Sequence, residues 1–138
     1  REGMLLKPNM VLAGSASTET RSVEDVADAT IGRLLRGVPA AVPGIAFLSG
    51  GQSAALASAR LNAMNIRFKS SMPWALAFSF ARAIQQPALE IWHGLEANVP
   101  AAQQALFHRA DCNHAARRGR YDAATDAAAD AADAAKPA

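Results

Sequence analysis

The sequence predicts an α/β fold in which the strands pair in parallel. Three short apolar runs are each followed by a turn and then by a longer stretch with helical periodicity. The second run, Gly44–Leu48, is continuously apolar, as in a strand that is buried on both faces. The chain has 138 residues, of which 51% are hydrophobic, so it can form one domain around one core.

The first unit begins with the run Met4–Pro8, which its proline ends. After a polar loop, Ser22 is followed three residues later by Asp25, which is typical of a helix N-terminus. Apolar side chains then recur at three-to-four spacing over residues 23–34. They predict an amphipathic helix that ends at Gly37.

The second unit joins the strand Gly44–Leu48 to a turn of small residues, 49–53, and then to a helix. We expect this helix to face the core with a stripe made of Leu56, Ala59, Ala63 and Met64.

The third unit begins with the apolar run 74–80, which leads directly into a helix that starts at Arg82. Pro87 is expected either to interrupt this helix or to open a second one. A further helix is expected from near Asn98 to about Arg117.

The domain prediction divides the chain into a folded part, residues 1–120, and an Ala- and Asp-rich tail, residues 121–138. Beyond Tyr121 the tail has aspartates at helical spacing but no large apolar side chain that could dock. We therefore expect a frayed helix or a flexible extension.

Lys7 is the first candidate for chemistry, because it ends an apolar strand and ligands bind at the carboxyl ends of strands in α/β domains. Apolar surroundings would disfavour its ammonium form, and the neutral amine could then form a Schiff base with a carbonyl. From the local pattern alone, a lysine that leaves the strand for solvent is the more common case.

The turns after the second and third strands both suit a phosphate. Ser49-Gly50-Gly51 lets the backbone approach an anion at a helix start, although a tight turn with Ser53 as the N-cap explains it equally well. Arg82 follows the third strand at the corresponding place and could pair with phosphate. Taken alone, Arg82 would be interpreted as an exposed arginine at a helix start. Because the turn 49–51 follows the adjacent strand, the two features together strengthen the prediction of a phosphate site. Ser79 points either into the same site or into the core.

Other classes of function find little support in the sequence. The net charge is +2, and the run Arg117–Arg120 lacks interleaved aromatic residues, so it is interpreted as a solvated helix end and no nucleic-acid partner is expected. His108, Cys112 and His114 fall short of the four ligands of a zinc site, so no metal is expected. No apolar stretch has the length of a membrane span. The single cysteine suits a reducing cytosol.

The segment Glu2–Val11 closely resembles the Schiff-base lysine signature of the class I fructose-bisphosphate aldolases. The resemblance continues through residues 38–44, 47–53, 61–65, 73–76 and 82–83, and it covers most of the chain up to about Tyr121. The family's fold is a (β/α)8 barrel, which takes about 250 residues. The resemblance therefore implies an incomplete TIM barrel: its last three βα units, strands six to eight, followed by C-terminal helices.

The resemblance also implies a role for each candidate residue. Lys7 would form the imine with the ketone of fructose 1,6-bisphosphate, and Leu48, Ser49 and Gly50 would bind a substrate phosphate. Arg82 would pair with a phosphate, and Ser79 would lie near the bound ketose. The imine replaces a metal, so no cofactor is implied. A homotetramer is implied for the full-length protein, in the cytoplasm.

This sequence departs from the family pattern at several positions. Ala81 stands where the family has glycine, and Arg1 stands where the signature has an apolar residue. The family's C-terminal tyrosine has no counterpart in Lys136-Pro137-Ala138. In the family, the acid–base glutamate and other substrate-binding lysines and arginines belong to earlier strands of the barrel, and no residue of this sequence is expected to replace them.

Three hypotheses follow. The first is a C-terminal fragment of such an aldolase, inactive alone, with open strand edges that reduce its solubility. The second is a non-catalytic module for binding phosphate or a partner, derived from such a barrel. The third is a different Schiff-base lyase.

Overall fold

The three predicted strands form one parallel sheet. The computed structural model describes residues 2–14 and 16–134. The sheet has the order β1-β2-β3, and its strands are β1 (Leu5–Leu6), β2 (Gly44–Phe47) and β3 (Ala75–Phe78). The α/β prediction and the parallel pairing are therefore confirmed.

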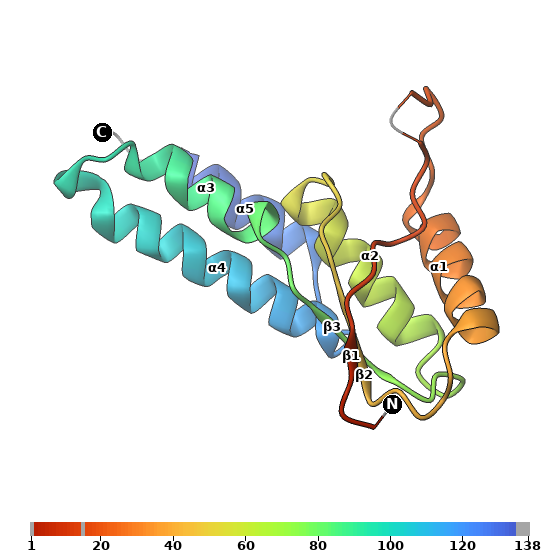
Figure 1. The fold of residues 1–138 in the computed structure, drawn as a ribbon. Helices are drawn as coiled ribbons and strands as arrows, with labels where there is room; N and C mark the ends of the chain where they lie inside the picture. The colour runs from red at the N-terminus through yellow and green to blue at the C-terminus, as the bar shows by residue number, and fades with distance from the viewer. Residues whose placement is uncertain (1, 15, 135–138) are drawn as a thin grey trace.

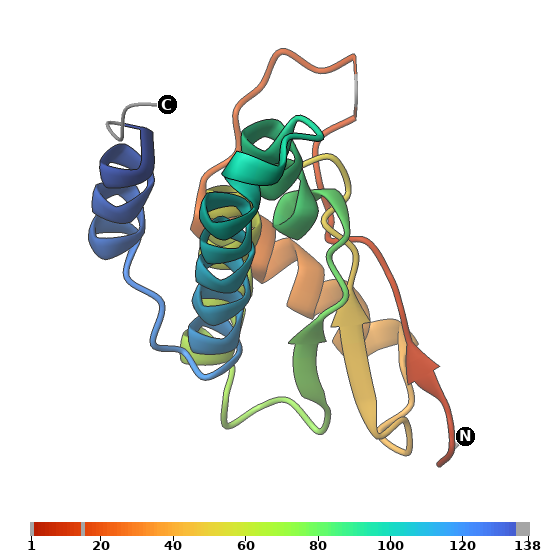
Figure 2. The same cartoon turned by 90° about the vertical axis from the view of Figure 1, so that its left-hand side faces the viewer.

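Helices follow each strand, as Figure 1 shows. Their bounds are α1 (Val23–Gly37), α2 (Ala54–Arg67), α3 (Arg82–Trp92), the short 3-10 helix η1 (Glu96–Asn98), α4 (Val99–Arg117) and α5 (Ala123–Ala134). In Figure 2 the strands run in one direction, and α2 and α4 lie together to one side of the sheet. The helices α3 and α4 form an antiparallel hairpin at one end of the molecule (Figure 1). Among the described residues, no helix is both long enough and apolar enough to cross a bilayer.

One face of the sheet carries the core, and the other face is open. Ile45, Phe47 and Leu76 are each at most 2% exposed and pack in the core with residues of α1, α2 and α3. Side chains alternate between the faces of a strand, so Leu5 points away from this core, and it is 69% exposed. This one-sided sheet agrees with part of a barrel whose inner face lacks its neighbours.

The helix α1 begins and ends where the sequence predicts. The Ser22 hydroxyl accepts a bond of 3.0 Å from the backbone N–H of Asp25, and the Asp25 carboxylate accepts one of 3.3 Å from the N–H of Ser22. This reciprocal capping satisfies two backbone donors at the helix start. The predicted stripe is confirmed by the buried residues Val26, Ala27, Thr30, Ile31 and Leu34.

The helix α2 is present, but its predicted buried stripe is only partly correct. Met64 is fully buried, as expected, whereas Leu56 is 43% exposed and the fully buried Leu61 was not expected. The buried face is Ala57, Ser58, Arg60, Leu61 and Met64. Because α2 is rich in alanine, its periodicity left two registers of similar strength, and packing against α1, α4 and β3 decides between them.

The expectation for Pro87 is also wrong, because α3 continues through it from Arg82 to Trp92. Proline lacks the N–H that would bond to the carbonyl of Ala83 one turn earlier. Close packing of α3 along α4 holds the two halves of the helix in line.

The tail contains the helix α5, and one of its residues docks. Asp126 is 2% exposed and pairs with the guanidinium of Arg109 on α4. The tail was expected to have little reason to dock, and the burial and pairing of Asp126 show that this expectation is wrong at that residue. Residues 135–138 lie outside the described residues, and the flexibility of the tail stays a prediction.

Candidate active site

All of the predicted site residues follow the carboxyl ends of the three strands. Because the strands are parallel, these ends meet at one edge of the sheet. The N–H of Leu48 donates a bond of 2.9 Å to the carbonyl of Pro8, and the N–H of Ser79 donates one of 2.8 Å to the carbonyl of Phe47. The segments that carry Lys7, Leu48 and Ser79 are therefore direct neighbours.

Lys7 lies on the open face of the sheet. Leu6 pairs in register with the buried Ile45, so the next side chain, Lys7, points to the opposite face. In this structure Lys7 is exposed. The expectation that apolar side chains withdraw it from water is therefore wrong for these three βα units by themselves, because no described element covers that face.

The turn after β2 requires its first glycine. Gly50 has φ +59°, a left-handed conformation that favours glycine, and a Cβ there would overlap the side-chain amide of Asn9. The Asn9 Oδ1 atom in turn accepts a bond of 3.0 Å from the N–H of Met10. Sequence reasoning gave Asn9 no role, although it lies within the segment that carries the resemblance.

The same turn is held by its own hydrogen bonds. Ser49 is 9% exposed, and its carbonyl accepts bonds from the backbone N–H (3.1 Å) and the side-chain amide (2.8 Å) of Gln52. Ser53 caps α2, since its hydroxyl accepts a bond of 3.3 Å from the N–H of Leu56. The tight-turn interpretation of this segment is thus confirmed, and it leaves the phosphate interpretation open.

Arg60 supports this turn from α2, and sequence reasoning missed it. Its guanidinium donates a bond of 2.8 Å to the Gln52 side-chain oxygen and one of 3.2 Å to the carbonyl of Arg21. The residue is 8% exposed, and burial lowers the pKa of its guanidinium. The signal that could have identified it is the position of Arg60 one residue before Leu61 and four before Met64, on the buried face of α2.

Arg82 is the first residue of α3, and it is exposed. The described residues provide no side-chain cap at this helix start, and the N–H of Ile84 bonds at 3.0 Å to the carbonyl of Ala81. Ala81 has φ −103°, which does not require glycine. The alanine at this family glycine position therefore fits the backbone without left-handed strain.

A second polar cluster lies between α4 and α5, and sequence reasoning identified only part of it. The described residues bring ligand atoms of His108, Cys112 and Asp126 within 4.8 Å of one another. His114 is not in this cluster. A guanidinium nitrogen of Arg109 lies 2.9 Å from His108 Nε2 and 3.3 Å from Cys112 Sγ, and it also pairs with Asp126. An organic cation thus lies among these three groups, where a metal ion would have to bind.

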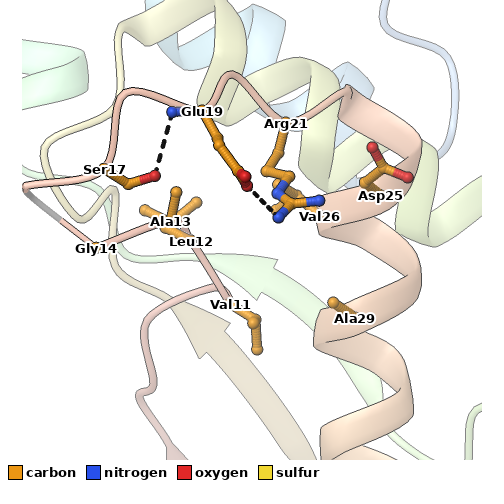
Figure 3. A pocket seen from close by; sticks show the side chains of 10 residues that line it. All are labelled: Val11, Leu12, Ala13, Gly14, Ser17, Glu19, Arg21, Asp25, Val26 and Ala29. Carbon is orange, nitrogen blue, oxygen red and sulfur yellow. Dashed lines mark hydrogen bonds and ion pairs between the residues drawn. The ribbon is translucent and has the colours of Figure 1, made fainter.

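A pocket of about 530 Å³ opens beside the loop that leaves β1 (Figure 3). It is lined by apolar residues that include Val11 and Val26 and by the polar residues Glu19, Arg21 and Asp25. The guanidinium of Arg21 already pairs with Glu19. A phosphate in this pocket would therefore be repelled by the carboxylate of Asp25, with no unpaired cation among the described lining residues to offset it. None of the predicted site residues lines it. The candidate active site is therefore the edge of the sheet.

Comparison with known proteins agrees with this arrangement. The family model for class-I fructose-bisphosphate aldolase matches residues 1–136. The chain belongs to this family. It is 51% identical over 131 residues to fructose-bisphosphate aldolase 1 of Caenorhabditis elegans, which covers 93% of this chain and 36% of the relative. It is 54% identical over 120 residues to fructose-bisphosphate aldolase B of Gallus gallus, which covers 87% of this chain and 33% of the relative.

A solved aldolase also has the same fold over its matched part. The fructose-bisphosphate aldolase of Plasmodium falciparum, solved in complex with TRAP and a small-molecule inhibitor, superposes with a TM-score of 0.79 at 46% identity. The match covers 86% of this chain and 33% of that aldolase chain. The chain thus spans about a third of the length of the aldolases it matches. The prediction of an incomplete TIM barrel from the C-terminal portion of an aldolase is confirmed.

Proposed function

We propose that this chain supplies the C-terminal third of a class I fructose-bisphosphate aldolase. The whole enzyme cleaves fructose 1,6-bisphosphate to dihydroxyacetone phosphate and glyceraldehyde 3-phosphate. The observation that carries the proposal is the family match together with the meeting of the Lys7, Ser49 and Arg82 segments at one edge of the sheet.

Lys7 is the proposed nucleophile. Its amine attacks the ketone carbon, and loss of water leaves a protonated imine. When the adjacent carbon–carbon bond breaks, the imine accepts the electron pair, the aldehyde product leaves, and an enamine remains on the lysine. Protonation of the enamine and hydrolysis of the imine then release dihydroxyacetone phosphate and restore the amine. No metal is needed for this electron sink.

The turns after β2 and β3 are the proposed phosphate site. The backbone at Leu48, Ser49 and Gly50 binds the phosphate, and its conformation is fixed because Gly50 packs directly against the Asn9 side chain. Arg82 adds a guanidinium, and the uncapped start of α3 adds N–H groups and the positive end of its dipole. Ser79 lies beside Leu48 in the ladder and contacts the bound ketose.

The rest of the barrel is required for turnover. The open face of the sheet leaves the Lys7 side chain exposed to water, without neighbours among the described residues that could position a substrate against it. The preceding strands would cover that face and bring the acid–base residues. We further propose a homotetramer for the full-length enzyme and a cytoplasmic location, although relatives from Pisum sativum are named chloroplastic.

The alternative is a module that binds phosphate without catalysis. The exposure of Lys7 is the observation that favours it. The two functions differ in what happens after binding, because a module binds a sugar phosphate and leaves it intact.

The test joins this chain to the amino-terminal two-thirds of one of its relatives and measures cleavage of fructose 1,6-bisphosphate. The joined protein should cleave the substrate. Lys7→Arg should lower its turnover rate at least about a thousandfold, and Lys69→Arg should leave the turnover rate unchanged. The 138-residue chain alone should show no turnover. Cleavage that survives Lys7→Arg would contradict the proposal, and cleavage of other ketose phosphates only would point to a different Schiff-base lyase.

A further inference from the structure

We propose a second anion-binding site for a small ligand that carries two or more phosphate groups. It lies near the starts of the strands, whereas Lys7 lies at their carboxyl ends. A pocket of about 280 Å³ lies where α2 and α4 end, and it is lined by Asn65, Lys69, Arg117, Arg118 and Arg120. In Figure 2 the strands run upward, and α2 and α4 both end at the bottom, beside the strand starts. The pocket is therefore remote from the proposed active site.

The arginine-bearing turn is held rigidly against α2. Asn65 donates a bond of 3.4 Å to the carbonyl of Ala116, and the Asn62 side-chain oxygen accepts one of 3.0 Å from the N–H of Tyr121. Between these anchors, Gly119 has φ +69°, and a Cβ there would come within 3.0 Å of the Ile66 side chain. The turn thus presents its arginines in one backbone conformation, which reduces the entropy lost on binding.

The charge of this pocket is not neutralised within the described part of the chain. Its four cationic side chains are exposed, and no carboxylate lines the pocket. The nearby acids have other partners: Asp28 forms a bidentate pair with Arg67, and Asp122 bonds to the N–H of Ala124 and the hydroxyl of Thr125. Those two bonds, that to Thr125 the stronger, lower the pKa of Asp122.

The helix ends do not cancel this charge. The C-termini of α2 and α4 each contribute roughly half a negative charge. Four cations therefore leave a local charge of about +3, which a single carboxylate would not balance. A multiply charged anion is the matching ligand.

The chemistry of the lining favours phosphate on a small molecule over nucleic acid. Three guanidinium groups offer planar pairs of donors that match phosphate oxygens. No aromatic ring lines the pocket, so a nucleobase has no surface on which to stack. The pocket volume of about 280 Å³ leaves room for a di- or triphosphate group. The Asn65 side-chain amide already donates to the carbonyls of Leu61 and Ala116, so its oxygen is the atom that can accept a bond from a hydroxyl group of the ligand.

The test is a titration of the ¹⁵N-labelled chain with tripolyphosphate at constant ionic strength, followed by amide chemical shifts. Because the proposed active site also attracts phosphate, the titration is done in an Arg82→Gln background. Amides of residues 117–121 should shift and saturate. The pair Arg118→Gln and Arg120→Gln should weaken binding at least about tenfold, which is the loss of one strong charged contact.

The matched control is the pair Arg33→Gln and Arg36→Gln, two exposed arginines on α1 that remove the same charge. It should change the affinity less than about twofold, the limit for remote screened charges. If the turn variants do not fold by circular dichroism, Lys69→Gln alone should weaken binding. Equal losses in both pairs, shifts spread over the whole surface, or binding of polyuridylate but not tripolyphosphate would each overturn the proposal.

Discussion

Single residues decide how the loops at the edge of the sheet pack against each other. Gly50 adopts a left-handed conformation against Asn9, so its identity follows from both backbone angle and space. Its place in a Gly-Gly turn was predictable from the sequence, because small residues between a strand and a helix mark such turns. The contact between Gly50 and Asn9 was not predictable, because the two residues follow different strands and are far apart in the sequence.

Gly50→Ala should therefore lower the free energy of unfolding by at least about 1–2 kcal/mol, the cost of left-handed backbone in a residue with a Cβ. Gly32→Ala is the matched control, since Gly32 lies within α1 and a methyl group added there would meet no described atom within 4 Å. It should stabilise the chain by about 0.5–1 kcal/mol. Urea denaturation measures both changes, and an equal effect of the two substitutions would contradict this explanation of the turn.

At the level of elements, the helices differ in how well the sequence predicts them. The helix α1 is predicted completely, because its cap and its stripe of larger apolar residues agree. In α2 the cap at Ser53 is correct, but the predicted stripe is correct at Met64 and wrong at Leu56, because alanines at many positions give little contrast between faces. The docking of α5 was missed, because Asp126 pairs with residues of α4 that no local pattern connects to it.

The face of α2 can be tested with two leucines of the same helix. Leu61→Ala should cost about 2–5 kcal/mol, because Leu61 is fully buried and a cavity would remain. Leu56→Ala should cost less than about 0.5 kcal/mol, because Leu56 is 43% exposed. Thermal or urea unfolding measures both, and the opposite order would restore the stripe that the sequence predicts.

The attachment of α5 depends on Asp126. Its carboxylate pairs with Arg109, lies 2.9 Å from His108 Nε2 and accepts a bond from the Tyr121 hydroxyl. Loss of one partner of a buried pair costs about 3–5 kcal/mol, so Asp126→Ala should release α5 from α4. Hydrogen exchange should then become fast over residues 123–134 and stay slow in β2.

Asp111→Ala removes an exposed acid from the same region and should leave this exchange pattern unchanged. Fast exchange over residues 123–134 in the unsubstituted chain would contradict the docking of α5 and support the flexible tail that the sequence predicts.

For the whole molecule, three βα units of a barrel leave one face of the sheet without a partner. The sequence predicts the architecture and the edge of the sheet at which the candidate residues meet, because strand order and parallel pairing follow from the alternation of strands and helices. It could not predict the exposure of Lys7, because the local pattern does not show which elements cover that face of the sheet. The basic pocket was also missed, because Lys69 and the arginine run approach each other only in the folded chain.

The central claim is that the amine of Lys7 forms an imine with a sugar ketone once the open face is covered. Within the given sequence the only other lysines are Lys69 and Lys136, and the lysines that the relative contributes to the joined protein are mapped together with them. The direct measurement is borohydride reduction in the presence of dihydroxyacetone phosphate, followed by mass spectrometry of the joined protein. The account predicts one reduced adduct on Lys7, lost in Lys7→Arg. A protein that cleaves the substrate while its adduct lies on another lysine, or forms on none, would contradict it.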